Sequence, residues 1–138
     1  MNILIINGSN VNLLGRLQPE LYGRESFEEH LGALRARYSA HTIDYYQSNI
    51  EGEIVDKLQE ADGHYDGIIL NAGGYTHTSV VIRDAIAAIS VPVSEVHISS
   101  ILAREEFRHV ALIAPVAKGA IMGFGMESYR LAVEHIIG

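Results

Sequence analysis

Short apolar runs alternate with amphipathic segments along this chain. Residues 2–7 (NILIIN) and 66–72 (DGIILNA) are continuous apolar runs, which are typical of strands buried on both faces. Residues 42–48 (TIDYYQS) alternate apolar and polar positions, as a strand does. Residues 91–99 (VPVSEVHIS) carry a proline near their start, where a strand tolerates it, and residues 110–115 (VALIAP) form another apolar run. The pattern therefore predicts five strands.

Helical periodicity fills the intervals between these runs. Ser26 and Glu29 have the spacing of a capping box, and an apolar stripe at helical spacing follows, made of Phe27, Leu31, Leu34 and Tyr38. Further helices are predicted over residues 51–62 and 78–90 and from about Gly125 to the last residue. A short helix is predicted around residues 103–107 (AREEF).

Strands that alternate with helices predict a parallel sheet covered on both faces. We expect an α/β, flavodoxin-like, doubly wound fold with five parallel strands in the order 2-1-3-4-5. Residues 1–138 are expected to form a single domain. Ligands of such sheets bind beyond the carboxyl ends of the strands, so the loops at that edge are the first place to look for a site.

Three of the predicted strands run into polar segments at that edge. These segments are NGSNVN (7–12), NAGGYTHTS (71–79) and SEVHISS (94–100). Turn and capping roles explain polar residues in any one loop. Because three such loops converge in space and two of them carry a histidine, a site is the better interpretation.

Within these loops, Glu95 and His97 are two residues apart on a strand and therefore share a face. A carboxylate beside an imidazole can orient it as a general acid, although a structural ion pair is an equally good interpretation of the pair alone. His77 precedes an apolar helix and is a capping residue or a ligand donor. Arg104 and Arg108 are four residues apart, on one face of the predicted short helix, and are surface charges or an anion-binding pair.

The amino-acid composition limits the ligands, partners and location that we expect for this protein. Ten basic and seventeen acidic residues give a net charge of −7, which argues against nucleic acid as the main partner but leaves room for a small anionic substrate. Cysteine is absent, and no apolar run is long enough to cross a bilayer, so we expect a cytoplasmic protein without a membrane partner. Asp84 and Arg83 interrupt an otherwise apolar helix, which suggests either a solvated stripe or a subunit interface.

The sequence lacks the motifs of several common catalytic mechanisms. The sequence has no GxSxG nucleophile elbow, no phosphate-binding P-loop and no HExxH motif. Its only lysines are Lys57, on a solvated helix face, and Lys118, which makes Schiff-base chemistry a poor candidate. We therefore expect acid–base chemistry by tyrosine, histidine and arginine, without a metal or an organic cofactor.

The motifs NGSNVNLLG, YG, QSNIEGEIVDKLQEA, NAGGYTHTSVVIRDA, SEVHISS, AREEFR and PVAKGAIMGFG occur in this order over essentially the whole chain. Together they resemble type II 3-dehydroquinate dehydratase. The resemblance implies a flavodoxin-like fold and a dodecamer built from trimers. It also implies the anti elimination of water from 3-dehydroquinate, through an enolate, to give 3-dehydroshikimate in aromatic biosynthesis or quinate breakdown.

The resemblance assigns roles to individual residues. Tyr22 matches the general base, His97 the general acid, Glu95 the residue that supports it, and Asn10 the residue that stabilises the enolate through a water. Substrate-binding positions are matched by Asn71, His77, Ile98, Ser99 and Arg108, the last facing the carboxylate. Asp84 matches a residue that reaches a neighbouring subunit's site, and Arg104 matches a second arginine near the site.

One loop departs from the family pattern. The family carries a catalytic arginine and then an acid where this chain has Leu17 and Gln18. Because a tyrosine has a pKa of about 10 in water, Tyr22 needs a cation nearby to act as a base, and Arg16 or Arg24 is the available substitute. The alternative function is accordingly a paralogue that binds a related cyclic hydroxy acid without efficient turnover.

Overall fold

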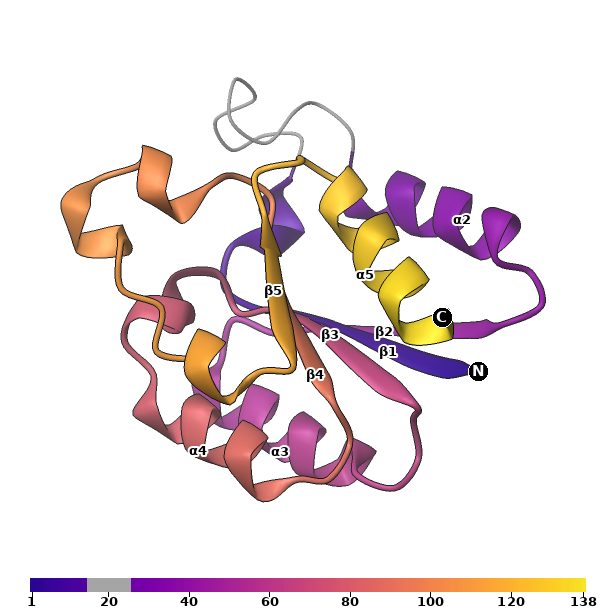
Figure 1. The fold of residues 1–138 in the computed structure, drawn as a ribbon, viewed down its shortest axis with the longest axis horizontal. Helices are drawn as coiled ribbons and strands as arrows, with labels where there is room; N and C mark the ends of the chain where they lie inside the picture. Colours follow the sequence, from indigo (N-terminus) through magenta and orange to yellow (C-terminus); the bar gives the residue numbers. More distant parts are fainter. Residues whose placement is uncertain (15–25) are drawn as a thin grey trace.

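The computed structural model describes residues 1–14 and 26–138. Five parallel strands form one sheet in the order β2-β1-β3-β4-β5 (Figure 1). This arrangement confirms the α/β class and the strand order expected from the sequence. The strands are β1 Asn2–Asn7, β2 Thr42–Gln47, β3 Gly67–Asn71, β4 Val93–His97 and β5 Gly119–Met122.

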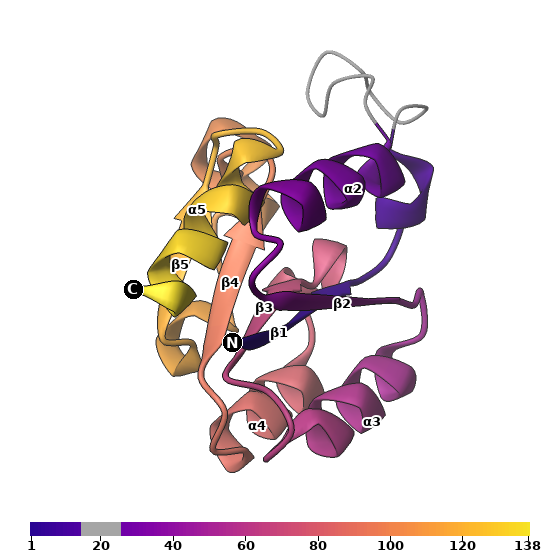
Figure 2. The same ribbon diagram turned by 90° about the vertical axis from the view of Figure 1, so that its right-hand side faces the viewer.

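In the described residues, four α-helices cover the sheet in two pairs. Helices α2 (Phe27–Arg37) and α5 (Glu127–Ile137) lie on one face, and α3 (Glu51–Ala61) and α4 (Val80–Ala88) lie on the other (Figure 2). Two of them start at serine caps, of which the sequence indicates Ser26; the cap of α4 is Ser79 and not His77. The Ser26 hydroxyl accepts a hydrogen bond from the Glu29 amide at 3.2 Å, and Ser79 caps α4 in the same way.

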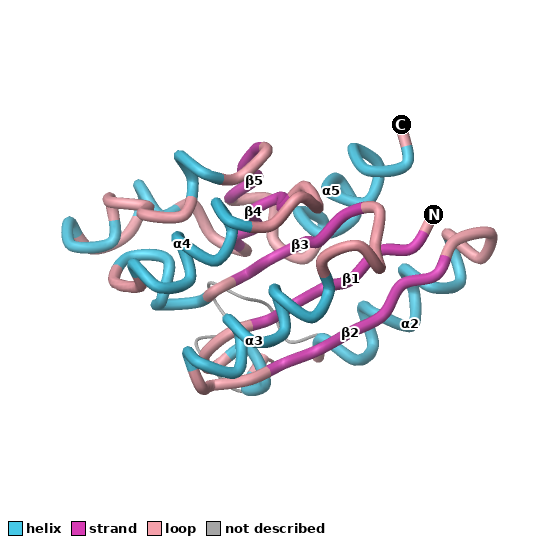
Figure 3. The backbone as a smooth tube through the Cα atoms, turned by 90° about the horizontal axis from the view of Figure 1, so that it is seen from below, coloured by secondary structure: helices cyan, strands magenta, loops and turns pink. Residues whose placement is uncertain are grey.

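Strand β1 shows why its sequence is apolar at consecutive positions. Ile3 and Ile5 pack into the core under α2 and α5, whereas Leu4 and Ile6 pack into the core under α3 and α4. All four side chains are at most 1% exposed. β1 lies between β2 and β3, so both of its faces and both of its edges are covered (Figure 3).

The strand predicted over residues 110–115 is wrong, because β5 is Gly119–Met122. Ile113 in the predicted segment is fully buried in the core under α3 and α4, and the Leu112 amide donates to the Thr76 carbonyl at 2.8 Å. Residues Ala114–Val116 then form a 3₁₀ turn that contains the proline. The segment is apolar because it packs against the core, although its backbone pairs with a loop instead of the sheet.

The short helix predicted around residues 103–107 is also absent. Two 3₁₀ turns, Ile101–Ala103 and Glu106–Arg108, take its place, and Arg104 between them is extended with φ −113° and ψ −167°. Arg104 and Arg108 therefore do not share a helical face. Within the described parts of the chain, no helix is both long enough and apolar enough to span a membrane.

Candidate active site

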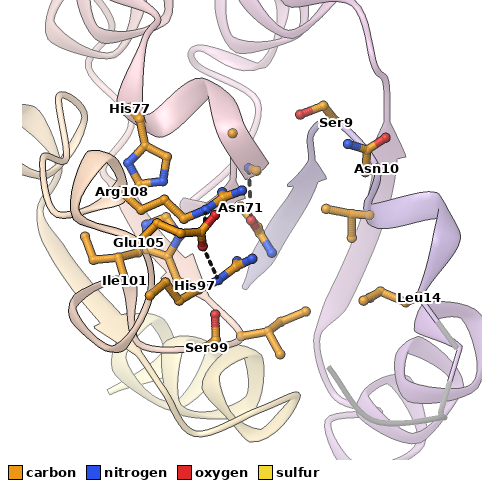
Figure 4. A pocket seen from close by; sticks show the side chains of 15 residues that line it. Ser9, Asn10, Leu14, Asn71, His77, His97, Ser99, Ile101, Glu105 and Arg108 are labelled. Carbon is orange, nitrogen blue, oxygen red and sulfur yellow. Dashed lines mark hydrogen bonds and ion pairs between the residues drawn. The ribbon is translucent and has the colours of Figure 1, made fainter. Parts of the chain in front are cut away.

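A pocket of about 330 Å³ lies at the carboxyl ends of β1, β3 and β4 (Figure 4). Its lining comes from the three polar loops that the sequence places at this edge, together with the segment that carries the two arginines. Eight of the residues predicted for the site line it: Asn10, Asn71, His77, His97, Ile98, Ser99, Arg104 and Arg108.

The sequence interpretation missed other lining residues. Ser9, Leu14, Ile101 and Glu105 also line the pocket. The signal for Glu105 was its position between the two arginines of the AREEFR motif, and the signal for Ser9 was its place beside Asn10. Ile101 and Leu14 supply apolar wall and carried no functional signal in the sequence.

His97 and Glu95 form a buried pair beneath the pocket. Their side chains point to the same face of β4, and His97 Nε2 lies 2.8 Å from Glu95 Oε1. Glu95 is 1% exposed and His97 is 7% exposed. The Thr76 hydroxyl, from the loop after β3, donates a hydrogen bond to the same Glu95 oxygen. Glu95 therefore holds the histidine ring from behind, and Thr76 holds the carboxylate.

The second carboxylate oxygen, Glu95 Oε2, is buried and has no hydrogen-bond partner among the described residues. An ionised oxygen in that position loses its hydration without full compensation. The cost falls when the neighbouring imidazole carries a positive charge. Among the described residues, His97 and Thr76 are therefore the groups that compensate this carboxylate.

Asn10 has a left-handed backbone with φ 68°, and it is the only non-glycine residue with positive φ in residues 1–14 and 26–138. Asparagine tolerates this region better than most residues do, but the conformation still has an energetic cost. The Asn10 amide nitrogen of the backbone donates to Asn49 Oδ1 at 3.0 Å, which holds the turn. The side chain lies at the pocket wall opposite His77 and Arg108 (Figure 4).

Two arginine side chains, Arg104 and Arg108, make another wall of the pocket positively charged. Arg108 Nε lies 3.2 Å from Glu105 Oε1, and Arg104 Nε lies 3.9 Å from the same oxygen. A hydrogen bond from its own backbone amide lowers the pKa of Glu105, and the two guanidinium groups lower it further. A single carboxylate between two guanidinium groups leaves a net positive charge at this wall, which suits an anionic ligand.

His77 is oriented by the backbone. Its Nδ1 lies 2.7 Å from the Val110 carbonyl oxygen, and because a carbonyl only accepts, Nδ1 carries the proton. In the neutral ring, Nε2 is then an acceptor that a hydroxyl-bearing ligand can use. The residues that the structure describes include no group of three or more histidine, aspartate or glutamate side chains arranged to hold a metal.

Among the predicted site residues that the structure describes, two do not line the pocket: Glu95, which lies behind His97, and Asp84. Asp84 is exposed on α4, where it lies 3.3 Å from Arg83. Tyr22 falls outside the described residues, as do Leu17 and Gln18 and the possible substitutes, Arg16 and Arg24.

The model of the protein family described as "Dehydroquinase class II" matches residues 1–137 of this chain. The chain belongs to the class II dehydroquinase family. This membership confirms the resemblance seen in the sequence motifs, on which the enzyme prediction rests.

Curated relatives and a solved structure agree with this class II dehydroquinase assignment. A protein of Campylobacter jejuni named 3-dehydroquinate dehydratase is 54% identical over 139 residues, which cover 99% of this chain and 87% of the relative. A Bacillus subtilis protein of the same name is 46% identical and covers 99% of this chain and 93% of its own. The crystal structure of type II dehydroquinase from Butyrivibrio crossotus superposes with a TM-score of 0.96 at 42% identity, covering 100% of this chain and 98% of the other.

Proposed function

We propose that this chain dehydrates 3-dehydroquinate to 3-dehydroshikimate by anti elimination through an enolate, with Tyr22 as the base and His97 as the acid. The observation that carries the proposal is the buried Glu95–His97 pair under a pocket with two arginines in its wall. Relatives at 45–54% identity bear the name 3-dehydroquinate dehydratase, which supports the choice of substrate.

The proposed reaction divides the proton transfers between two groups. The Tyr22 phenolate takes a proton from the carbon beside the ketone, and the electron pair of that C–H bond moves into an enolate. The enolate then re-forms the ketone and expels the hydroxyl group, to which His97 gives its proton, so that water leaves. Tyr22 ends protonated and His97 ends neutral, and exchange with solvent restores both.

The described geometry fits the role of His97. Glu95 fixes the ring through Nε2, so Nδ1 is the nitrogen available to a bound molecule. The negative charge of Glu95 stabilises the imidazolium that gives the proton. General acid catalysis of this kind contributes about 10²- to 10⁴-fold to a rate.

The remaining polar residues of the pocket are assigned to binding. Asn10, through a water, is proposed to stabilise the enolate oxygen. Arg108 is proposed to face the substrate carboxylate, because guanidinium groups bind carboxylates with two parallel hydrogen bonds. We assign the contacts with the hydroxyl and carboxylate oxygens of the substrate to Asn71, His77, Ile98 and Ser99. Arg104 adds positive charge near the substrate in this proposal.

Assembly is part of the proposal. We propose a dodecamer built from trimers, in which Asp84 reaches the site of a neighbouring subunit. Val80 and Val81 on the same helix are 56% and 51% exposed, which is unusual for valines and suits a subunit contact. Analytical ultracentrifugation tests the assembly, and a monomer at assay concentration would exclude it.

A direct assay tests the reaction. Purified protein is mixed with 3-dehydroquinate, and the absorbance of the conjugated enone is followed. We expect turnover in the wild type and a loss of about 10²-fold or more in His97→Asn and Tyr22→Phe. Absence of any signal above buffer at high protein concentration would refute the proposal.

The second candidate function is a paralogue that binds a related cyclic hydroxy acid without efficient turnover. The observation in its favour is Leu17, which stands where the family has a catalytic arginine. A large gain in turnover for Leu17→Arg, from a slow wild type, would favour this candidate. Turnover at an ordinary enzymatic rate in the wild type would exclude it.

A further inference from the structure

The Asn71 side chain is held by two described partners. It ends β3, lines the pocket and is 5% exposed. Its Oδ1 accepts a hydrogen bond from the Gly73 amide at 3.1 Å, and its Nδ2 donates to the Tyr129 hydroxyl at 2.9 Å. Tyr129 comes from the first turn of α5 and is fully buried. A residue far along the chain therefore contacts a side chain of the site.

The contact belongs to a chain of hydrogen bonds with a fixed direction. The Tyr129 hydroxyl donates to Asn7 Oδ1 at 2.7 Å, and Asn7 Nδ2 donates to the Tyr45 hydroxyl at 3.3 Å. The Gly73 amide can only donate, so the Asn71 atom that faces it must be the oxygen. That assignment places the Asn71 nitrogen at Tyr129 and sends the single proton of Tyr129 to Asn7.

The direction of the chain decides what the site can offer a ligand. One hydrogen of Asn71 Nδ2 is used by Tyr129, and its second hydrogen has no acceptor among the described residues. The Asn71 side chain lies in the pocket together with His97 and Arg108 (Figure 4). The available group is therefore an N–H donor, which suits a hydroxyl or carboxylate oxygen.

The surroundings of Tyr129 keep its hydroxyl in this role. Burial raises the pKa of Tyr129, so the phenol remains neutral and continues to donate throughout the range of an enzyme assay. Its ring packs edge-on against Phe27, with centroids 4.9 Å apart. A phenylalanine at this position would keep the ring packing and lose only the oxygen.

We propose that Tyr129 is a positioning residue of the site, whose hydroxyl accepts one hydrogen of the Asn71 amide and, together with the Gly73 amide, holds it so that it presents its other N–H to an oxygen of the bound cyclic hydroxy acid. The identity of that ligand rests on the proposed function. The orientation of the amide does not, because it follows from the hydrogen bonds within the chain.

The test compares Tyr129→Phe with a matched variant on the same helix contact. We expect Tyr129→Phe to raise KM for 3-dehydroquinate about tenfold, equivalent to about 1.4 kcal/mol, with kcat changed less than about twofold. Tyr38→Phe is the control, since the Tyr38 hydroxyl donates to Glu134 of α5 at 2.7 Å and Tyr38 does not line the pocket. The control is expected to lose some stability and to keep the wild-type KM.

A double-mutant cycle asks whether Tyr129 acts through Asn71. In an Asn71→Ala background, Tyr129→Phe is expected to raise KM no further. Additive effects, or a wild-type KM in Tyr129→Phe, would overturn the inference.

A spectroscopic measurement separates this inference from the proposed function. The two side-chain amide protons of Asn71 are observed by ¹H–¹⁵N NMR on the full chain. We expect slow solvent exchange in the wild type and in Tyr38→Phe, and faster exchange in Tyr129→Phe. Unchanged Asn71 resonances in Tyr129→Phe would overturn the inference, whereas absence of turnover in the wild type would overturn the proposed function.

Discussion

His97 Nε2 lies 2.8 Å from Glu95 Oε1, and both side chains are almost fully buried. The Glu95 carboxylate therefore holds the histidine ring in place, although burying this carboxylate costs desolvation free energy. We expect the pair to contribute more to catalysis than to the stability of the fold. A substitution that removes the charge of Glu95 distinguishes these two contributions.

Glu95→Gln keeps the size of the side chain and removes its charge. We expect kcat to fall about 10²-fold with little change in KM, because the imidazolium loses its counter-charge. The free energy of unfolding should change by less than about 1 kcal/mol, since the substitution also removes the desolvation cost of a buried carboxylate. Enzyme kinetics and urea denaturation measure both, and the exposed Glu60→Gln is the control. Undiminished kcat in Glu95→Gln would contradict the role given to the pair.

Thr76→Val removes the hydroxyl that donates to Glu95 Oε1. Thr76 is fully buried, so the carboxylate loses a partner that water does not replace, at a cost of about 1–3 kcal/mol in unfolding free energy. Activity should fall as well, because Glu95 is no longer fixed behind His97. Thr76→Ser keeps the hydroxyl and should recover most of the loss. Equal behaviour of the two variants would show that the hydroxyl has no part in the effect.

Gly8→Ala tests the close approach of two strand ends at the site. A Cβ at Gly8 would lie 2.4 Å from the Ala72 carbonyl oxygen, which is backbone and cannot move aside cheaply. We expect a loss of about 2–4 kcal/mol in unfolding free energy and a large rise in KM. Gly32→Ala is the control, because nothing lies within 4 Å of its Cβ and the position is in the middle of α2. The Gly32→Ala variant should be stabilised by about 0.5–1 kcal/mol. If the unfolding free energy that Gly8→Ala loses is smaller than this gain, the close packing of Gly8 against the Ala72 carbonyl is contradicted.

The Tyr65–Asp44 contact predicts a dependence on alkaline pH. The Tyr65 hydroxyl donates to Asp44 Oδ2 at 2.7 Å, and this hydrogen bond raises the pKa of Tyr65 to about 12 from 10.0. Because the folded-state pKa is raised, the contact stabilises the fold fully below pH 10, and its contribution is lost as pH rises toward 12. Phenolate absorbance should show this late titration, and Tyr65→Phe should remove it. Asp44→Asn should move it toward 10, and an unmoved titration would exclude Asp44 as the cause.

The layer structure of the fold could be predicted from the sequence because its three central strands obey a simple rule. β1, β3 and β4 are buried on both faces and run into polar loops, and β1 and β3 also appear as apolar runs, whereas β4 carries Ser94, Glu95 and His97 between its valines. β5 lies at the edge of the sheet, is four residues long and is partly exposed, so its sequence GAIM has no such run. The run VALIAP was more apolar, and its core contacts come from a loop.

The candidate site was predictable to the extent that it lies in those loops. Strand ends gather at one edge whatever the details of the turns, which placed Asn10, Asn71 and His97 together. Tyr129 could not be found in this way. On the apolar face of α5 it looks like an ordinary core residue, and its hydroxyl partners lie 58 and 122 residues earlier in the chain.

That separation has a consequence for how the protein matures. Asn7 and Asn71 leave the ribosome well before Tyr129, which follows Asn7 by 122 residues. Until α5 docks, neither amide has its hydrogen bond with Tyr129, and each has only a partner from the earlier chain, Tyr45 for Asn7 and Gly73 for Asn71. A chain whose central strands have already assembled therefore still lacks a pocket in which both amides are oriented. The protein becomes able to bind its ligand only when α5 docks.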